Sequence, residues 1–278
     1  MRLMHERLLM SLPLAPEYQA PERPRGLGIV RGAYSFFNVP EARFIESAVA
    51  RIIPNDDLGP GALEAGVSFF LDQQLQSKFG LAANLYMQGP WGGGEATAQQ
   101  DAAEGGSGGE DAQTGVGVAE QPGYQLPLKP QELYRLIIAA LDTYAEETFG
   151  SVFATLSTAQ QDEMLTQRED GNITVEPLPP EILANFWRIF LASTLQGYFS
   201  DPLYGGNRDK VGWRLVGFPG VAAAYKGVMQ AYYGQPYRVE PVSIADIQNG
   251  DVATSSDGHA IHRDLISGRV IEGVEHEH

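Results

Sequence analysis

Carboxylate and imidazole side chains are the groups of this sequence best suited to chemistry, and their spacing indicates what they could do. Asp56 and Asp57 are adjacent in "PNDDLGPGALEAG". Paired carboxylates between two helices could bind a cation or act as an acid and a base. Such residues more often cap the following helix and interact favourably with its dipole. The twelve-residue calcium-loop pattern is absent, and capping is therefore the favoured interpretation.

Histidines are concentrated towards the C-terminus. His259 and His262 are three residues apart in "HAIH", and His276 and His278 occur in "HEH". On a helix, the first spacing would turn both imidazoles to one side, as a metal site requires. This tail is polar and contains Gly and Ser, so a rigid metal site is not expected there. The remaining histidine, His5, lies in an N-terminal arm, which leaves no positioned histidine for a serine triad.

Cysteines and phosphate-binding motifs are both missing from the sequence. Without cysteine, the chain has no disulfide, no cysteine-ligated iron–sulfur cluster, no C-x-x-C-H attachment of haem and no thiol nucleophile. The glycine clusters "YGGN" and "WGGGE" lack the Lys and Ser of a P-loop and the strand that precedes a dinucleotide fingerprint. We therefore expect no cofactor to be bound by this chain.

The overall charge limits the possible partners. The chain has 278 residues, 43 % of them hydrophobic, and a net charge of −16. The average face of such a molecule repels nucleic acid and anionic membranes, and the Arg and Lys residues are too dispersed for a basic patch. No segment approaches the roughly 18 uninterrupted apolar residues of a membrane helix. The N-terminus shows neither an apolar run of export length nor twin arginines, so the chain as written is not expected to direct its own secretion.

Helical periodicity predicts the elements that position these residues. Asn38 and Glu41 form a capping-box pair before a helix that Pro54 ends. The apolar positions on one face of this helix are Phe44, Ile45, Ala48, Val49, Ile52 and Ile53. A second helix is predicted over residues 62–78. Its inner stripe is Leu63, Val67, Phe70, Leu71 and Leu75. A short polar turn joins the two helices, which indicates a helical hairpin.

More helices are predicted further along the chain. One begins at Pro130, and its apolar positions are Leu133, Ile137, Leu141 and Tyr144, with Leu136 and Ala140. Ser157 and Gln160 form a second capping box, which begins a short polar helix. The most apolar helix covers residues 181–199, and a helix apolar on nearly all sides belongs in the centre of a bundle. A weaker helix is predicted over residues 221–233.

These elements predict an all-α protein, a single-domain irregular helical bundle with long loops and mobile termini. Residues 1–33 form an arm, residues 34–244 the helical domain and residues 245–278 a flexible C-terminal tail. Residues 92–122 are rich in Gly, Ala, Gln and acidic residues and contain no Lys or Arg. Such a segment buries too little apolar surface to offset backbone ordering, at roughly 1 to 2 kcal/mol per residue. It is predicted to be a disordered acidic insertion.

The segment "DPLYGGNRDKVGWRLVGFPG", Asp201 to Gly220, has neither helical nor strand periodicity and is rich in glycine, proline and aromatic residues. One interpretation is structural: Gly205 and Gly206 supply positive φ, prolines fix turns, and aromatic residues plug the end of the bundle. The other is that the loop faces a partner, because aromatic and Arg residues dominate interface hot spots. The residues presented would be Tyr204, Asn207, Trp213 and Phe218. The residues alone leave both interpretations open.

Several longer motifs follow one another in a characteristic order. They are "EARFIESAVARIIPNDDLGPGALEAGVSFFLDQQL", "YMQGPW", "GYQLPLKPQELYR", "QGYFSDPLYGGNRDKVGWRLVGFPG" and "PYRVEPVSI". This order, from about Phe36 to Ile244, closely resembles the gluconate 2-dehydrogenase subunit 3 family. Its members are the small subunits of membrane-bound, flavin-dependent sugar and sugar-acid dehydrogenases.

The resemblance implies a helical, non-catalytic subunit that holds an FAD-bearing large subunit of the glucose-methanol-choline oxidoreductase type. The pair would pass electrons to a multihaem cytochrome c subunit on the periplasmic side of the inner membrane. Small subunits of this kind mature the large subunit and typically carry its twin-arginine export signal, which this sequence does not show, so a cytoplasmic complex is the alternative. The loop holds the family's strongest motif, and the partner-binding residues that this implies are Tyr204, Gly205, Gly206, Asn207, Trp213, Phe218 and Pro219.

Two other functions stay open at this stage. A transient export or folding chaperone of the large subunit would leave before the enzyme works and would be missing from the mature complex. A free-standing metal-dependent enzyme could be built on Asp56, Asp57, Asp201 and Asp209. That enzyme would contain tightly bound metal when purified and would lose turnover when these aspartates are replaced by asparagine.

Overall fold

The structure is a computed structural model. It describes residues 33–83, 85, 87, 126–169, 173, 175, 178–221, 232–235, 237–252, 262–263 and 270–271. The chain divides into two compact units, Met1–Ala33 and Tyr34–His278, and every element below belongs to the second. The predicted arm, the 92–122 insertion and most of the helix predicted over residues 221–233 lie outside the described residues.

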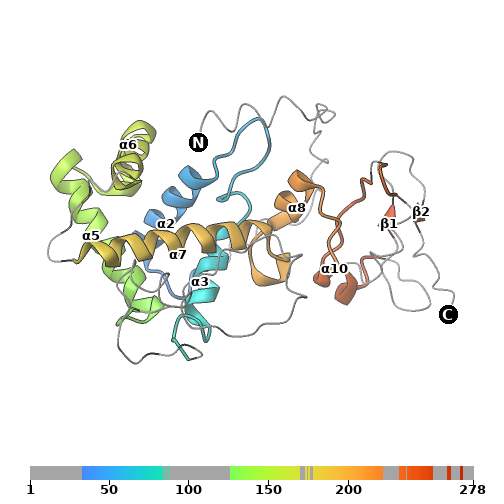
Figure 1. The fold of residues 1–278 in the computed structure, drawn as a ribbon, viewed down its shortest axis with the longest axis horizontal. Helices are drawn as coiled ribbons and strands as arrows, with labels where there is room; N and C mark the ends of the chain where they lie inside the picture. The colour runs from blue at the N-terminus through green and yellow to red at the C-terminus, as the bar shows by residue number, and fades with distance from the viewer. Residues whose placement is uncertain are drawn as a thin grey trace, which may run out of the picture. The chain divides into compact units, whose positions relative to one another are not determined.

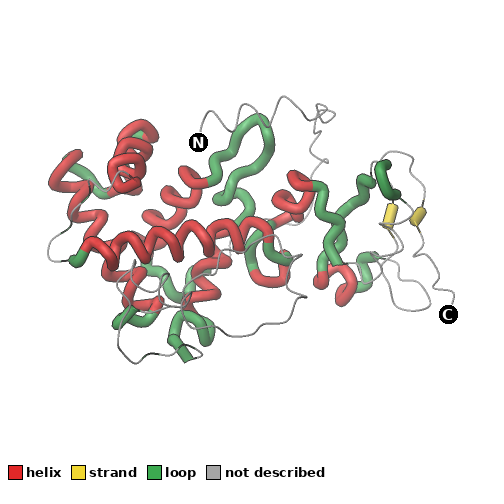
Figure 2. The backbone as a smooth tube through the Cα atoms, viewed as in Figure 1, coloured by secondary structure: helices red, strands yellow, loops and turns green. Residues whose placement is uncertain are grey.

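The described part of the chain is helical, as predicted (Figures 1 and 2). Its α-helices are α2 (Val39–Ile52), α3 (Val67–Gln76), α5 (Pro130–Phe149), α6 (Thr158–Glu169), α7 (Pro180–Phe199), α8 (Val211–Val216) and α10 (Ile244–Asn249). Its short 3₁₀ helices are η1 (Phe153–Thr155), η2 (Pro202–Tyr204) and η3 (Arg208–Lys210). The two-residue strands β1 (His262–Arg263) and β2 (Val270–Ile271) pair antiparallel. His262 is therefore on a strand and not on a helix.

Helix α2 forms as predicted, because its capping box is complete. The Asn38 side chain accepts a hydrogen bond from the Glu41 N–H at 2.9 Å, and the Glu41 carboxylate accepts one from the Asn38 N–H at 2.9 Å. The helix ends at Ile52, two residues before Pro54. Its buried residues are Ala42, Phe44, Ile45, Ala48 and Val49. The predicted apolar face therefore lies against the core.

Helix α3 begins later than predicted, at Val67 and not at residue 62. The chain first packs closely on the end of α2, where a Cβ on Gly61 would lie 2.5 Å from the Ile53 carbonyl oxygen. Residues 62–66 form turns, and Gly66 starts the helix with φ 77°. Leu63 consequently lies outside the helix and is exposed, so its predicted place on the inner stripe is wrong.

Helices α5 and α6 also form where they were predicted. The buried face of α5 includes Leu133, Ile137 and Leu141, but it is turned towards Tyr134 and Ile138. Leu136, which was expected to widen that face, is exposed. Ser157 and Gln160 make the predicted capping box before α6.

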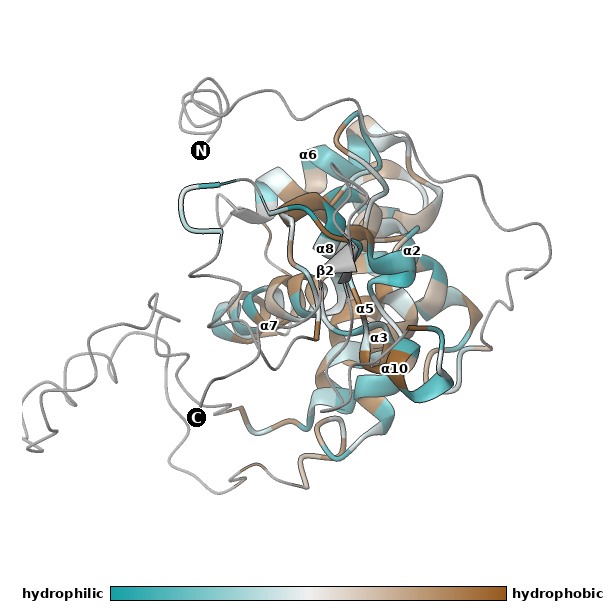
Figure 3. Ribbon diagram, turned by 90° about the vertical axis from the view of Figure 1, so that its right-hand side faces the viewer, coloured by the Kyte–Doolittle hydropathy of each residue, from teal (hydrophilic) through white to brown (hydrophobic). Residues whose placement is uncertain are grey.

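Helix α7 runs through the centre of the described helices, shown in yellow in Figure 1, and packs against α2, α3, α5 and α8. Phe186 and Phe190 on α7 surround the buried ring of Tyr134 on α5, at centroid distances of 5.1 and 6.2 Å. Brown, hydrophobic segments recur along α7 in Figure 3. One side of the helix is nevertheless exposed, at Leu191, Leu195 and Phe199. The most apolar helix is therefore central but not fully covered within the described part of the chain.

Candidate partner-binding site at the loop after helix α7

The loop Asp201–Gly220 leaves α7 through a tight turn. Asp201 caps η2 by accepting a hydrogen bond from the Leu203 N–H at 2.9 Å. Gly205 has φ 92°, as predicted. Gly206 is needed for a different reason than the one expected, because its φ is not positive and a Cβ there would lie 2.1 Å from the Gly197 carbonyl oxygen. The second glycine lets the loop fold back onto α7.

Of the four non-glycine residues with positive φ in the described part of the chain, three lie in the next four positions. Asn207, Asp209 and Lys210 have φ values of 46°, 56° and 58°. A left-handed backbone costs an L-residue roughly 1 to 2 kcal/mol, although Asn and Asp tolerate it better than Lys. Contacts elsewhere in the structure must hold this segment in place.

Asn207 fastens the strained segment from the inside. Its side-chain amide donates a hydrogen bond to the Ser200 carbonyl oxygen at 2.8 Å, and its carbonyl oxygen accepts one from the Gly212 N–H at 2.8 Å. The residue is fully buried. Asn207 therefore joins the end of α7 to the start of α8 and does not face solvent.

Trp213 has a similar internal position on α8. Its indole Nε1 donates a hydrogen bond to the Phe199 carbonyl oxygen at 2.7 Å. The centre of its ring lies 5.2 Å from the centre of the Phe218 ring, and the two rings are in a T-shaped arrangement. Only 4 % of Trp213 is exposed, compared with 50 % of Tyr204 and 41 % of Phe218. Among the predicted partner-binding residues, Tyr204 and Phe218 thus lie at the surface, whereas Asn207 and Trp213 lie inside.

The loop also packs on the turn that precedes α3. The Arg208 N–H donates a hydrogen bond to the Ala65 carbonyl oxygen at 2.9 Å. The Arg208 guanidinium lies 5.8 Å from the centre of the Phe69 ring on α3. The motif that contains Asp56 and Asp57 therefore also contributes the turn on which the loop rests.

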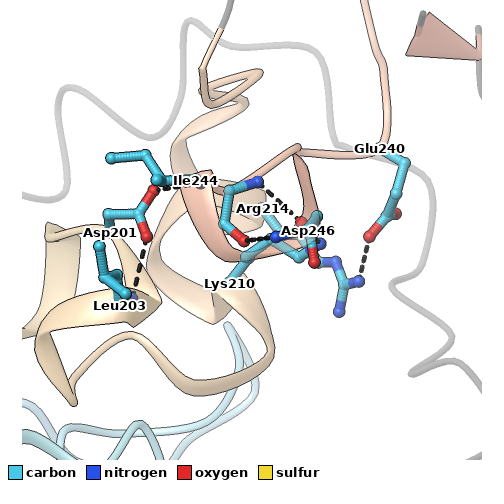
Figure 4. Close-up of polar contacts among 8 residues, drawn as sticks. Asp201, Leu203, Lys210, Arg214, Glu240, Ile244 and Asp246 are labelled. Atoms are coloured by element: carbon cyan, nitrogen blue, oxygen red, sulfur yellow. Dashed lines mark hydrogen bonds and ion pairs between the residues drawn. The ribbon is translucent and has the colours of Figure 1, made fainter. Parts of the chain in front are cut away.

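A second segment, residues 239–250, closes over the loop, and we call it the clasp (Figure 4). Val242 pairs with Gly220 in a parallel bridge, through hydrogen bonds of 3.0 Å to the Pro219 carbonyl and 2.7 Å from the Val221 N–H. Asp201 accepts a bond from the Ile244 N–H at 2.8 Å with its second carboxylate oxygen. The clasp includes α10, so the segment expected to be a flexible tail from residue 245 begins within a capped helix.

Two ion pairs join the loop to the clasp. Lys210 Nζ lies 2.8 Å from Asp246 Oδ2, and Arg214 pairs with Glu240. Partial burial of the Asp246 carboxyl disfavours its charged form, but hydrogen bonds from Lys210 and Ser243 outweigh this and lower its pKa. The cations of the loop are therefore matched by carboxylates of the clasp.

An exposed apolar surface lies where α7 meets α8. The ring of Phe199 lies 3.1 Å from the position that a Cβ on Gly212 would take. Leu215 and Val216 follow Gly212 by three and four positions and therefore lie on the same side of α8. We define the α7–α8 apolar surface by its exposed members, which are Leu195, Phe199, Leu215, Val216 and Phe218.

The carboxylates considered for metal or acid–base chemistry are not grouped. Asp56 accepts a hydrogen bond from the Leu58 N–H at 2.8 Å within an exposed turn, and Gly66 rather than an aspartate begins α3. The prediction that this pair caps α3 is therefore wrong. Asp201 uses both oxygens on backbone N–H groups. In the described ranges, no three Asp, Glu or His residues gather as a metal site would require.

Asp72 is a buried carboxylate that sequence reasoning missed. It accepts hydrogen bonds from the N–H groups of Ser35, Phe36 and Phe37, at 2.8 to 3.0 Å, and from the Ser35 hydroxyl at 2.8 Å. It thereby holds the chain that leads into α2. The signal available in the sequence was its position: Asp72 directly follows Leu71, which lies on the predicted inner stripe of the helix, so a buried carboxylate could have been expected there.

The fold and the loop together define a class of protein. A helical domain in which an exposed apolar surface lies beside a loop fastened by internal hydrogen bonds is typical of a protein-binding domain. The chain belongs to the gluconate 2-dehydrogenase subunit 3 family, whose model matches residues 40–220. The match confirms the resemblance noted in the sequence. No curated protein and no solved structure matches the chain.

The matched range has two consequences for the site. It ends at Gly220, so it includes the whole loop and none of the clasp. The family description names a subunit, which implies partner subunits. Of the helices that the structure describes, none is both long enough and apolar enough to cross a membrane.

Proposed function

We propose that this chain is the non-catalytic small subunit of a flavin-dependent gluconate or sugar dehydrogenase complex. The match to subunit 3 of gluconate 2-dehydrogenase over residues 40–220 is the observation that carries the proposal. In this complex, a large subunit of the glucose-methanol-choline type holds FAD and oxidises the substrate. A multihaem cytochrome c subunit receives the electrons. The small subunit stabilises and matures the large subunit and binds neither cofactor nor metal itself.

The contact with the large subunit is proposed to lie at the α7–α8 apolar surface and at Tyr204. Fully burying a Leu or Phe side chain stabilises an interface by about 1.5 to 3 kcal/mol, and a few such residues dominate binding. Gly205, Gly206 and Pro219 shape the backbone of this region. Asn207 and Trp213 support it from the inside, so their part in partner binding is to position the residues at the surface.

The complex is proposed to work on the periplasmic side of the inner membrane, attached there through its other subunits. A cytoplasmic complex is the alternative. Fractionation of cells that express the whole complex separates the two, because the tagged chain is expected with the periplasmic face of the membrane fraction.

The function is tested by affinity purification of the tagged full chain from cells that express the complex. The expected result is a flavoprotein in about equal amount, with the absorbance of FAD and the bands of haem c. The chain purified alone is expected to be colourless. A stoichiometric flavin spectrum in the isolated chain, or tightly bound metal with turnover, would overturn the proposal in favour of an independent enzyme.

The same experiment distinguishes a subunit from a transient chaperone. A subunit remains in the complex that turns over substrate, at a constant ratio to the large subunit. A chaperone is found with the immature large subunit and is absent from the active fractions. Comparison of the ratio across gel-filtration fractions therefore decides between the two.

A further inference from the structure

The clasp is attached to the loop at points spread along the loop's whole length. Asp201 contacts Ile244 near the start and Lys210 contacts Asp246 in the middle (Figure 4). Pro219 contacts Val242 at the end. The matched range ends at Gly220 and does not reach these residues of the clasp, although Val242 and Ile244 belong to the "PYRVEPVSI" motif noted in the sequence. The loop therefore takes its conformation partly from a segment that the family match does not include.

The clasp itself is held by few apolar contacts. Helix α10 has no buried residue. The buried apolar residues of the clasp are Val239, Pro241 and Val242, and the two valines are not members of the main core that α2, α3, α5 and α7 share. Segments with few buried apolar contacts open locally without global unfolding. The clasp is thus able to open while the helical core stays folded.

The loop has a reason to change when the clasp opens. Lys210 has a left-handed backbone, which is unfavourable for a lysine, and its ammonium group is held by Asp246. Asp201 divides its two oxygens between Leu203 in the loop and Ile244 in the clasp. Opening the clasp removes the partner of Lys210, whose backbone is left-handed, and frees one of the two carboxylate oxygens of Asp201, which caps η2.

We propose that the clasp is a conformational latch, which keeps the Asp201–Gly220 loop in the form that binds a partner when closed and releases it when open. The coupling between clasp and loop stands on the contacts given above. The effect on partner binding rests on the proposed function as well. The two parts are therefore tested by separate measurements.

The coupling is tested by thiol labelling, for which the cysteine-free chain is well suited. Three full-length reporters each carry one buried cysteine: Val242→Cys in the clasp, Val211→Cys where the loop borders the main core, and Ala145→Cys on α5 within that core. In each reporter, Asp246→Ala is compared with Asp57→Asn, an exposed acid outside the site. We expect Asp246→Ala to accelerate labelling at least tenfold at Val242→Cys and Val211→Cys, and to leave Ala145→Cys unchanged.

Two outcomes would overturn the latch. Faster labelling at Val242→Cys alone would show that the loop keeps its form without the clasp. Equal acceleration at Ala145→Cys would show that the clasp belongs to the main folding unit. Asp246→Asn is the milder second variant, because it removes the charge opposite Lys210 and keeps an oxygen to accept from Ser243, and it is expected to give a smaller acceleration at the same two sites.

The effect on partner binding is measured by co-purification with the FAD-bearing subunit from cells that express the complex. Asp246→Ala is expected to lower the amount of bound flavoprotein at least threefold relative to Asp57→Asn. Coupled labelling with unchanged co-purification would overturn the regulatory part of the proposal. If the unaltered chain captures no flavoprotein, the proposed function fails, while the labelling result still decides whether the latch exists.

Discussion

At the scale of single residues, Trp213 and Tyr204 have opposite environments within one loop. Trp213 is buried and donates its indole N–H to the end of α7, whereas half of Tyr204 is exposed and its hydroxyl makes no hydrogen bond within the described part of the chain. Substitutions at the two positions therefore separate the structural role of the loop from its role in binding.

Tyr204→Ala is expected to weaken assembly without changing stability. Fewer than about a third of interface residues cost more than about 1 kcal/mol of binding when truncated, and tyrosine is enriched among them, so a loss of about tenfold in affinity, about 1.4 kcal/mol, is expected for Tyr204. Trp213→Ala should lower both assembly and the free energy of unfolding, the latter by about 3 to 5 kcal/mol. Denaturant unfolding and co-purification measure the two quantities. Neither variant should alter the substrate affinity of the complex that still forms.

Asp72→Asn is expected to destabilise the domain. Its carboxylate accepts hydrogen bonds from three backbone N–H groups, and an amide would turn an NH₂ group towards one or two of them. Leaving buried donors unsatisfied costs about 1 to 3 kcal/mol each. Denaturant unfolding of Asp72→Asn, with Asp57→Asn as the exposed control, should show a loss in that range. An unchanged midpoint would mean that Asp72 does not hold the segment before α2.

At the scale of elements, the features that depend on neighbouring residues could be predicted from the sequence, whereas those that depend on contacts between distant residues could not. The capping boxes at Asn38 and Ser157 are local, and both helices begin where these residues predicted. The start of α3 depends on the close approach of Gly61 to the end of α2, which no spacing in the sequence reveals. The clasp was missed for the same reason, since Asp201 and Ile244 are far apart in the chain.

The exposed side of α7 allows a matched test of the interface. Leu195 on α7 and Leu136 on α5 are exposed to similar extents, 42 % and 39 %. Glu at either position should change the free energy of unfolding by less than about 0.5 kcal/mol, as surface substitutions usually do. Leu195→Glu should abolish co-purification of the flavoprotein, because it places a charge in an apolar contact, and Leu136→Glu should not. Equal binding by both variants would move the interface away from α7.

Acid should open the clasp before it unfolds the core. The folded pKa of Asp246 is lowered below its ordinary value of 3.8, so the ionised carboxylate stabilises the clasp above that pH and the stabilisation is lost as the pH falls through the folded value. Hydrogen exchange at the Gly250 amide, corrected for intrinsic rates, should therefore accelerate below about pH 3.8. In Asp246→Asn this step should be missing. A step of equal size in that variant would show that ionisation of Asp246 does not control the opening.

At the scale of the whole molecule, the strongly acidic chain has a nearly neutral region at the proposed binding site. The loop and the clasp together contain three basic residues, Arg208, Lys210 and Arg214, and four acids, Asp201, Asp209, Glu240 and Asp246. Nearly all of the net charge of −16 therefore resides elsewhere in the chain. Binding through the α7–α8 apolar surface should consequently depend weakly on salt, and surface plasmon resonance between 50 and 500 mM salt should change the affinity by less than about threefold.

The link from Asp201 to Ile244 also sets an order of events during synthesis. The ribosome makes the loop first, and the last residue of the clasp follows Gly220 by 30 positions. At about 5 to 20 residues per second, this interval is roughly 2 to 6 s. During that interval, Asp201 lacks the hydrogen bond from Ile244 and Lys210 lacks its ion pair with Asp246. The loop, where we propose that the partner binds, is therefore among the last parts of the domain to mature, and docking on the finished chain is favoured over docking during translation.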